Sequence, residues 1–206
     1  MNIIHRGGVY FKNNSLIDLV RKCVYEILNI FIFIIDFFRK VRFYFFTKCW
    51  VKNVKSQIKI VGLANKITIG KDAFLYDRSI FELGVTANLT IGKNFTFSYG
   101  SLIACHSSIL IGDYVMIGEY CSIRDTSHSY KQKLQFSLQP DISKPIIISN
   151  NVWIGRGCII LPGSVIENDV IIAANSVVKG LVKSGCIYGG SPAKFIKRIR
   201  EEMITI

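Results

Sequence analysis

The residue of this sequence best suited to acid–base chemistry is His128, in the segment IRDTSH of residues 123–128. It lies near the start of a polar stretch, residues 124–145, in which the regular pattern of the surrounding sequence is absent. Structureless stretches of this length within a compact domain are usually functional or disordered. An imidazole with an ordinary pKa of about 6.5 can act as a general base at neutral pH, so this loop is where we look for catalysis.

A catalytic imidazole needs a group that fixes its ring tautomer, and a carboxylate does this in hydrolase triads. Asp125 lies three residues before His128 and is the first candidate. Asp113 and Glu119, on a neighbouring repeat, are the alternatives, and the sequence does not choose among the three. His106 falls at a turn between repeats, where a structural role is the better prediction.

The six cysteines contain no C-x-x-C pair, so neither a zinc ribbon nor a redox pair is expected. Cys121 and Cys158 stand at the repeat position that Val152 and Val170 occupy elsewhere. We therefore predict small buried side chains in a reducing compartment. No residue, including Cys105 beside His106, has the surroundings of an activated nucleophile.

The element that must position His128 is a repeat with a period of six residues. One phase of this repeat contains only aliphatic residues: Ile148, Ile154, Ile160, Ile166, Ile172 and Val178. The period matches neither a helix nor a simple strand. Three such sixes make one triangular coil, and stacked coils bury a single aliphatic column, so we predict a parallel β-helix rather than a β-sandwich with evenly spaced strands.

The same period extends back to about residue 56, less regularly. The residues from Ile91 to Ile109 are in phase, and the phase then slips by two residues to Ile111. Glycine follows several of the aliphatic residues, where we expect the chain to turn without a clash at Cβ. These glycines follow Ile69, Ile91, Ile111, Ile117 and Ile154. We predict a β-helix domain over residues 56–180, with residues 124–145 as its protruding loop.

The flanking segments are predicted to be helical. In residues 1–55, apolar residues between positions 15 and 47 recur at spacings of three and four, and Ser15 is a suitable N-cap. The longest uninterrupted apolar run is too short for a membrane span, which needs about 20 residues. This segment could also cover the first coil. In residues 181–206, we predict a turn at 189–192 and a short basic helix over 193–203.

The positive net charge of the chain limits the kinds of binding partner that we expect. The chain of 206 residues is half apolar and carries a formal net charge of +12, most of it in residues 1–60. Such basic patches favour anionic partners, namely a membrane surface, a phosphorylated ligand or nucleic acid. Nucleic acid ranks last, because no recognised nucleic-acid motif is present. Residues 15–50 are predicted either to lie at a membrane interface or to pack on the repeats or a partner subunit.

Taken together, these motifs resemble the hexapeptide-repeat acyltransferases, in particular the galactoside, maltose, serine and surface-polysaccharide O-acetyltransferases. The resemblance covers about residues 89–200 and is carried by IRDTSH (123–128), PIIISNNVWIGRGCIILPGSVI (145–166), IIAANSVVKG (171–180) and YGGSPAKFIKRI (188–199). It implies a left-handed β-helix, a homotrimer with active sites at subunit interfaces, and direct acetyl transfer from acetyl-CoA with no metal.

The resemblance also implies roles for single residues. His128 matches the catalytic histidine, which takes the proton of an acceptor hydroxyl as its oxygen attacks the thioester. Trp153 matches a tryptophan beside the active site. The acyl-CoA contacts carry over to Arg156, Ala174, Lys179, Lys194 and Lys197. This sequence departs from the family where Lys179 and Gly180 directly follow the S-V-V segment, because the family usually has Ser or Thr, Lys and Asp there.

We therefore expect an O-acetyltransferase acting on a sugar hydroxyl of a cell-surface polysaccharide or its lipid-linked precursor. No signal peptide is recognisable, so we expect the cytoplasm, with peripheral contact at the inner face of the plasma membrane. The alternatives are an N-acetyltransferase for a sugar-nucleotide amine and a non-catalytic trimeric scaffold at the membrane. A zinc enzyme of the γ-carbonic anhydrase type needs three histidines, and only His106 and His128 lie in the repeats.

Overall fold

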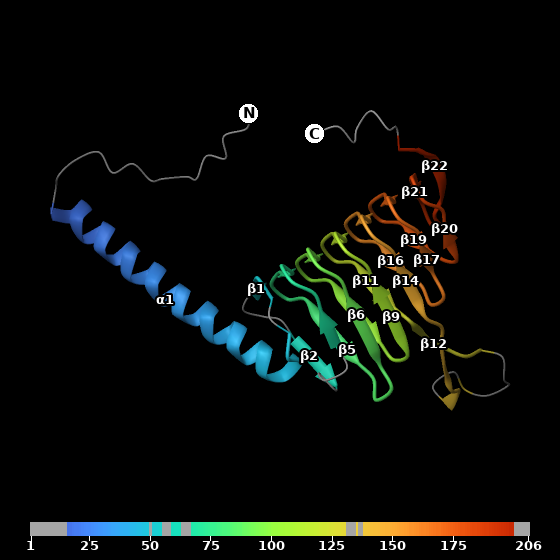
Figure 1. Cartoon of the computed structure of the whole chain (residues 1–206), viewed down its shortest axis with the longest axis horizontal. Helices are drawn as coiled ribbons and strands as arrows, with labels where there is room; N and C mark the ends of the chain where they lie inside the picture. The colour runs from blue at the N-terminus through green and yellow to red at the C-terminus, as the bar shows by residue number, and fades with distance from the viewer. Residues whose placement is uncertain are drawn as a thin grey trace. The chain divides into compact units, whose positions relative to one another are not determined.

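The computed structural model describes residues 16–49, 51–54, 59–62, 67–130, 135 and 138–199. Within these ranges, one long helix is followed by short strands that are stacked coil upon coil in three main sheets (Figure 1). The chain forms two compact units, residues 1–38 and residues 39–206, and the strands belong to the second. The predicted parallel β-helix is confirmed.

The three sheets take their strands from successive coils. Sheet A contains β1 (Asn53–Val54), β4 (Phe74–Leu75), β7 (Thr96–Phe97), β10 (Met116–Ile117), β15 (Trp153–Ile154), β18 (Ile171–Ile172), β21 (Cys186–Gly189) and β22 (Lys194–Arg198). Sheet B contains β2 (Lys59–Gly62), β5 (Ile80–Leu83), β8 (Leu102–Cys105), β11 (Ser122–Arg124), β16 (Ile159–Ile160) and β19 (Val177–Val178). Sheet C contains β3 (Ile67–Ile69), β6 (Asn88–Ile91), β9 (Ser108–Ile111), β14 (Ile146–Ile148), β17 (Val165–Ile166) and β20 (Leu181–Val182). The chain passes through the sheets in the order A, B, C.

The six-residue period corresponds to one residue per sheet at the centre of the coils. Ile148, Ile154 and Ile160 belong to sheets C, A and B in turn, and all three side chains are completely buried. The phase slip occurs between sheets B and C, because Ile103 of β8 and Ile111 of β9 are eight positions apart instead of six. The same corner carries the long excursion, so this corner is where the repeat accepts insertions.

Glycines that follow the aliphatic residues avoid a clash at Cβ, as expected, and the clash would be with the next coil. Gly118 and Gly155 are not among the residues with positive φ. A Cβ on Gly118 would lie 2.7 Å from the backbone nitrogen of Arg156, and a Cβ on Gly155 would lie 2.7 Å from that of Ala174. Glycine is therefore required at these two positions because the next coil approaches closely. The backbone conformation of the turn does not require it.

We expect Gly118→Ala to lower the free energy of unfolding by about 1–3 kcal/mol, because the added methyl group must push two coils apart. Urea unfolding followed by circular dichroism measures this loss. The control is Val85→Ala, whose side chain is 78% exposed and should change stability by less than about 0.5 kcal/mol. Equal stabilities for the two variants would contradict the close-approach explanation.

Residues from the end of helix α1 onward contribute side chains to the core at the N-terminal end of the solenoid, which is one of the arrangements left open by the sequence. Helix α1 (Leu16–Thr47) brings Phe43 into the core, and Cys49 and Val51 follow it there. The Cys49 sulfur accepts a hydrogen bond from the backbone N–H of Ile69 at 3.2 Å. Ser15, the predicted N-cap, lies outside the described residues.

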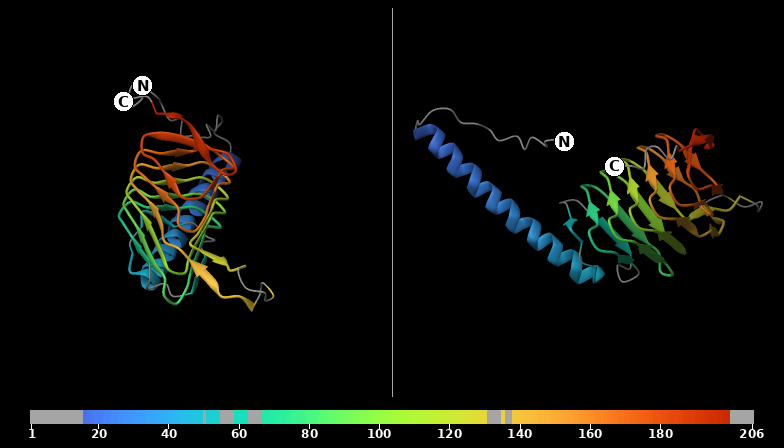
Figure 2. Two further views of the ribbon diagram at one scale, coloured as in Figure 1. Left: turned by 90° about the vertical axis from the view of Figure 1, so that its right-hand side faces the viewer. Right: turned by 45° about the horizontal axis from the view of Figure 1, so that its top comes forward.

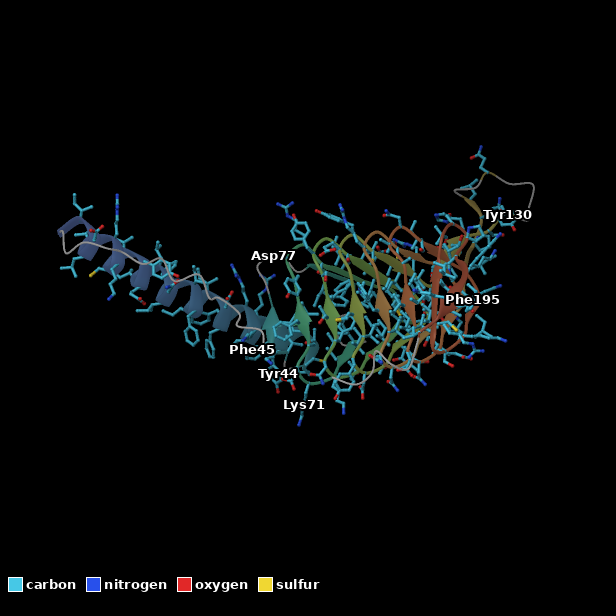
Figure 3. All side chains as sticks on the ribbon, turned by 90° about the horizontal axis from the view of Figure 1, so that it is seen from above. Tyr44, Phe45, Lys71, Asp77, Tyr130 and Phe195 are labelled. Carbon is cyan, nitrogen blue, oxygen red and sulfur yellow. The ribbon has the colours of Figure 1, made fainter. Side chains whose placement is uncertain are left out.

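The C-terminal prediction is wrong over residues 194–198. This segment forms strand β22, which pairs antiparallel with β21 at the edge of sheet A. Phe195 packs edge-on against Tyr188, with 5.9 Å between the ring centroids, and it lies at this end of the coils in Figure 3. The ladder of β21 supplies backbone partners and an aromatic contact, which outweigh the local helix preference of the segment. The predicted turn at 189–192 precedes this strand.

Candidate active site

His128 is positioned by an antiparallel hairpin that leaves the coils between sheets B and C (Figure 2). The hairpin consists of β12 (Thr126–His128) and β13 (Asp141–Ser143), and its register places His128 opposite Asp141. The Nδ1 atom of His128 lies 2.7 Å from Oδ1 of Asp141. The two side chains are 77% and 51% exposed, so Asp141 contacts the ring while much of the ring stays open to a substrate.

This pairing sets the chemistry of the ring. A carboxylate next to Nδ1 favours the tautomer in which Nδ1 carries the hydrogen and donates it. The lone pair then lies on Nε2, the nitrogen that a general base uses to accept a proton. His128 and Asp141 therefore form an acid–base pair of the kind found in hydrolytic triads.

The predicted partner of His128, Asp125, has a different function in the structure. Its carboxylate is buried and accepts hydrogen bonds from the backbone N–H groups of His106, Ser107 and Ser108, each at 2.8 Å. A further hydrogen bond comes from the Thr126 hydroxyl at 3.0 Å. The contacts of Asp125 thus go to the coil, and Asp141, which the sequence analysis missed, orients the imidazole ring.

Asp125 instead anchors the base of the hairpin. Its neighbour Thr126 shares a 2.8 Å hydrogen bond with the Ser143 hydroxyl, which joins the two strands where they leave the coil. The backbone N–H of Lys144 donates to the Asp125 carbonyl at 2.8 Å. One buried carboxylate therefore ties the turn of the preceding coil to the strand that carries His128.

Neither of the other two candidate carboxylates, Asp113 and Glu119, contacts the imidazole of His128 in the described part of the chain. Asp113 accepts a hydrogen bond from the backbone N–H of Lys93 at 2.9 Å, and its side chain pairs with the Lys93 ammonium at 3.8 Å. Glu119 is exposed at the corner between sheets A and B, and no contact joins it to His128 in the described part of the chain. Neither residue replaces Asp141.

His106 belongs to a charged cluster at the same corner as the hairpin. Its Nε2 atom lies 3.2 Å from one oxygen of Glu82, and the Arg124 guanidinium lies 3.4 Å from the other. Burial by itself raises the pKa of Glu82, but the hydrogen bond with His106 and the charge of Arg124 outweigh it and lower the pKa. Glu82 is therefore a carboxylate at neutral pH, and it links three successive coils.

The cysteines of the coils have the buried environment that was predicted. Cys49, Cys105, Cys121, Cys158 and Cys186 are buried, whereas Cys23 of α1 is exposed. Burial, together with the charge of Asp125, raises the pKa of the Cys105 thiol to about 12. Cys105 is therefore a neutral thiol at physiological pH and is unsuited to act as a nucleophile.

Trp153 and Arg156 lie on another part of the coil than the hairpin. Trp153 is half exposed on sheet A, whereas the hairpin leaves the corner between sheets B and C, across the triangular coil from sheet A. Arg156 and Ala174 meet at the corner between sheets A and B, where the backbone N–H of Asn175 donates to the Arg156 carbonyl at 2.8 Å. One copy of the chain does not bring these residues next to His128.

The predicted phosphate-binding lysines are exposed and lie in two places. Lys179 follows β19 at the corner between sheets B and C, and Lys194 and Lys197 lie on the edge strand β22. In the part of the chain that is described, no group of three or more His, Cys, Asp and Glu side chains is arranged to hold a metal ion.

Known proteins resemble this chain over most of the β-helix. A family model described as "Bacterial transferase hexapeptide (six repeats)" matches residues 145–180. The galactoside O-acetyltransferase of Escherichia coli is 31% identical over 65% of this chain and 64% of its own length. WbbJ of the same organism, whose name places it in lipopolysaccharide biosynthesis as an O-acetyl transferase, is 35% identical over 48% of this chain. This chain spans 55% of WbbJ, less than two thirds of either relative.

Longer coverage comes from a Saccharomyces cerevisiae protein named as an acetyltransferase, which is 33% identical over 75% of this chain and 76% of its own length. A maltose O-acetyltransferase from Clostridium difficile has a similar structure, with a TM-score of 0.51, 26% identity, and coverage of 73% of this chain and 71% of that one. AntD, an N-acyltransferase from Bacillus cereus crystallised with dTDP and 3-hydroxybutyryl-CoA, shares the fold at 19% identity, with a TM-score of 0.67 and coverage of 78% and 87%. This chain belongs to the hexapeptide-repeat acyltransferase family.

Proposed function

We propose that this protein transfers an acetyl group from acetyl-CoA to a sugar hydroxyl of a surface polysaccharide or its lipid-linked precursor. The observation that carries this proposal is the 2.7 Å pair between His128 and Asp141 on a hairpin that exposes the imidazole ring. Relatives named as galactoside and lipopolysaccharide O-acetyltransferases support the acceptor class. The protonated Cys105 thiol favours direct transfer over a covalent acyl-enzyme.

In this mechanism, Nε2 of His128 takes the proton of the acceptor hydroxyl as the oxygen attacks the thioester carbonyl. The resulting imidazolium is stabilised by the adjacent Asp141 carboxylate. The C–S bond then breaks, and His128 returns the proton to the departing sulfur, so that CoA leaves as the free thiol. The products are an acetyl ester and CoA, and no metal takes part.

We propose a homotrimer as the working form, because the site residues of one copy lie on different parts of the coil. In such an assembly, Trp153, Arg156 and Ala174 of one copy would face the hairpin and Lys179 of the next. Aliphatic side chains on the outside of the coils support this contact, since Met116 is 48% exposed and Leu181 57% exposed. Lys194 and Lys197 would meet the CoA phosphates as point charges.

Asp141→Asn is expected to lower kcat by about tenfold or more, because an asparagine no longer selects the tautomer with its lone pair on Nε2. KM for acetyl-CoA should change little, since Asp141 contacts the imidazole and not the donor. Steady-state kinetics of CoA release measures both constants. Asp141→Glu, which keeps the carboxylate, should retain more activity than Asp141→Asn, and the reverse order would contradict the orienting role.

Calorimetric titration of the purified protein with acetyl-CoA, with free CoA as the control, tests the donor. Saturable binding in the micromolar range supports the transferase function and allows a screen of sugar acceptors. If neither ligand binds, the transferase proposal fails and a non-catalytic scaffold becomes the better account.

A further inference from the structure

Six of the eight charged residues of helix α1, all except Glu26 and Arg42, form pairs separated by 18 residues. Asp18 and Asp36 are separated by this distance, as are Arg21 and Arg39, and Lys22 and Lys40. Eighteen residues make about five full turns at 3.6 residues per turn, so the two members of each pair project in the same direction. The arginines and lysines stand three and four residues after the aspartates, which places one basic row on each side of the acidic row.

Most of the remaining circumference of the helix is apolar, with Glu26 just outside the lysine row and Arg42 beyond the arginine row. Ile27, Phe31, Ile34 and Phe38, at spacings of four and three, lie opposite the acidic row. These residues are 64%, 63%, 44% and 63% exposed. Asn29 and Tyr25 fall within the polar strip. The helix is therefore amphipathic, with a basic row at each border of its apolar face, two aspartates in the middle of its polar face, and Glu26 beside the lysine row.

We propose that this face of α1 binds to the surface of an anionic lipid bilayer. Lysine and arginine at the borders can extend their charged ends to lipid phosphates while their methylene groups stay with the apolar face. The acidic row then points away from the bilayer, where it meets the least repulsion from the headgroups. None of the helices among the described residues is long and apolar enough to cross a membrane, so the helix lies in the interface.

Charge also argues against a second copy of the helix as the occupant of this face. In a bundle of parallel helices, the borders of one apolar face meet the borders of the next. Here each border carries a basic row and only Glu26 beside the lysine row is acidic, so an arginine row would meet mainly lysines, and like charges at such positions destabilise association. A layer of lipid phosphates neutralises both rows at once.

Flotation of the full chain with lipid vesicles tests this proposal. We expect binding to phosphatidylcholine vesicles that contain phosphatidylglycerol, weaker binding to phosphatidylcholine alone, and a loss of the difference at high salt. Each basic residue near an anionic surface contributes about a fivefold factor in affinity, so Lys22→Gln with Lys40→Gln should weaken binding about 25-fold. Lys71→Gln with Lys183→Gln removes the same charge from exposed positions on the coils and is the matched control.

A second pair of variants tests the apolar face. Ile27→Asn with Phe31→Asn should abolish binding to both kinds of vesicle, whereas Tyr25→Asn on the polar strip should not. The proposal is overturned if the wild type does not float, or if the lysine variant and its control bind equally. It is also overturned if the apolar variant changes the mass measured by light scattering without lipid, because the face then contacts another copy. Acetyl transfer to a soluble saccharide should be equal in all these variants, which separates this proposal from the proposed function.

Discussion

Replacing His128 with alanine is expected to lower kcat for acetyl transfer by about 10²–10⁴-fold, the usual contribution of a positioned general base. Among the described residues, the side-chain contact of the imidazole is with Asp141, and the hairpin strands pair through their backbones. The substitution should therefore leave the fold and the affinity for acetyl-CoA close to those of the wild type. Colorimetric detection of the CoA thiol measures the rate, and calorimetry measures the binding.

The matched control is His106→Gln, which keeps a hydrogen-bond donor beside Glu82. It should retain most of the activity, because His106 is held in a charged cluster on the coil and not on the hairpin. A His128→Ala variant that binds acetyl-CoA and turns over at the wild-type rate would contradict the assignment of the general base.

Replacing Asp125 with alanine is expected to lower the free energy of unfolding by about 3–5 kcal/mol. The change leaves the partly buried backbone N–H groups of His106, Ser107 and Ser108 without their acceptor, and an unsatisfied buried donor costs about 1–3 kcal/mol. The hairpin also loses its anchor at Thr126, so activity should fall with stability. Chemical unfolding and the thiol assay measure the two effects on the same samples.

Asp141→Ala provides the matched comparison, because it removes the same side chain from the exposed strand of the hairpin. It should lower kcat with little loss of stability, whereas Asp125→Ala should lower both. Asp125→Asn restores one acceptor oxygen and should fall between the wild type and Asp125→Ala in stability. If Asp125→Ala unfolds at the wild-type denaturant concentration, the anchoring role is wrong.

The β-helix could be predicted from the sequence because the same requirement for a buried aliphatic residue recurs in every coil. Each coil needs one inward aliphatic residue per sheet, so residues such as Ile148, Ile154 and Ile160 appear every six positions. Insertions were recognisable as interruptions of this period. The segment of β22 has no such period. It forms a strand because it pairs with β21 at the edge of sheet A, and this pairing cannot be inferred from the local sequence.

His128 could be selected from the sequence as the candidate general base, but Asp141, which lies 2.7 Å from its imidazole, could not be identified as its partner. Asp141 meets His128 only through the register of the hairpin, and the intervening sequence carries no short turn motif that would fix this register. Asp125 is close to His128 in sequence, yet strand geometry turns successive side chains to opposite sides, and its carboxylate points into the coil. The reason for Gly118 was hidden as well, because it depends on the backbone of the next coil.

The most direct test of the central claim is to incubate the wild type with acetyl-CoA and a panel of saccharides, then analyse the acetylated product and the released thiol together. We expect one thiol for each acetyl group transferred, an acetyl ester that hydroxylamine removes, and neither product with His128→Ala. An acetyl product that resists hydroxylamine would be an amide and would contradict transfer to a hydroxyl. Thiol release at the same rate in wild type and His128→Ala would contradict catalysis by this site.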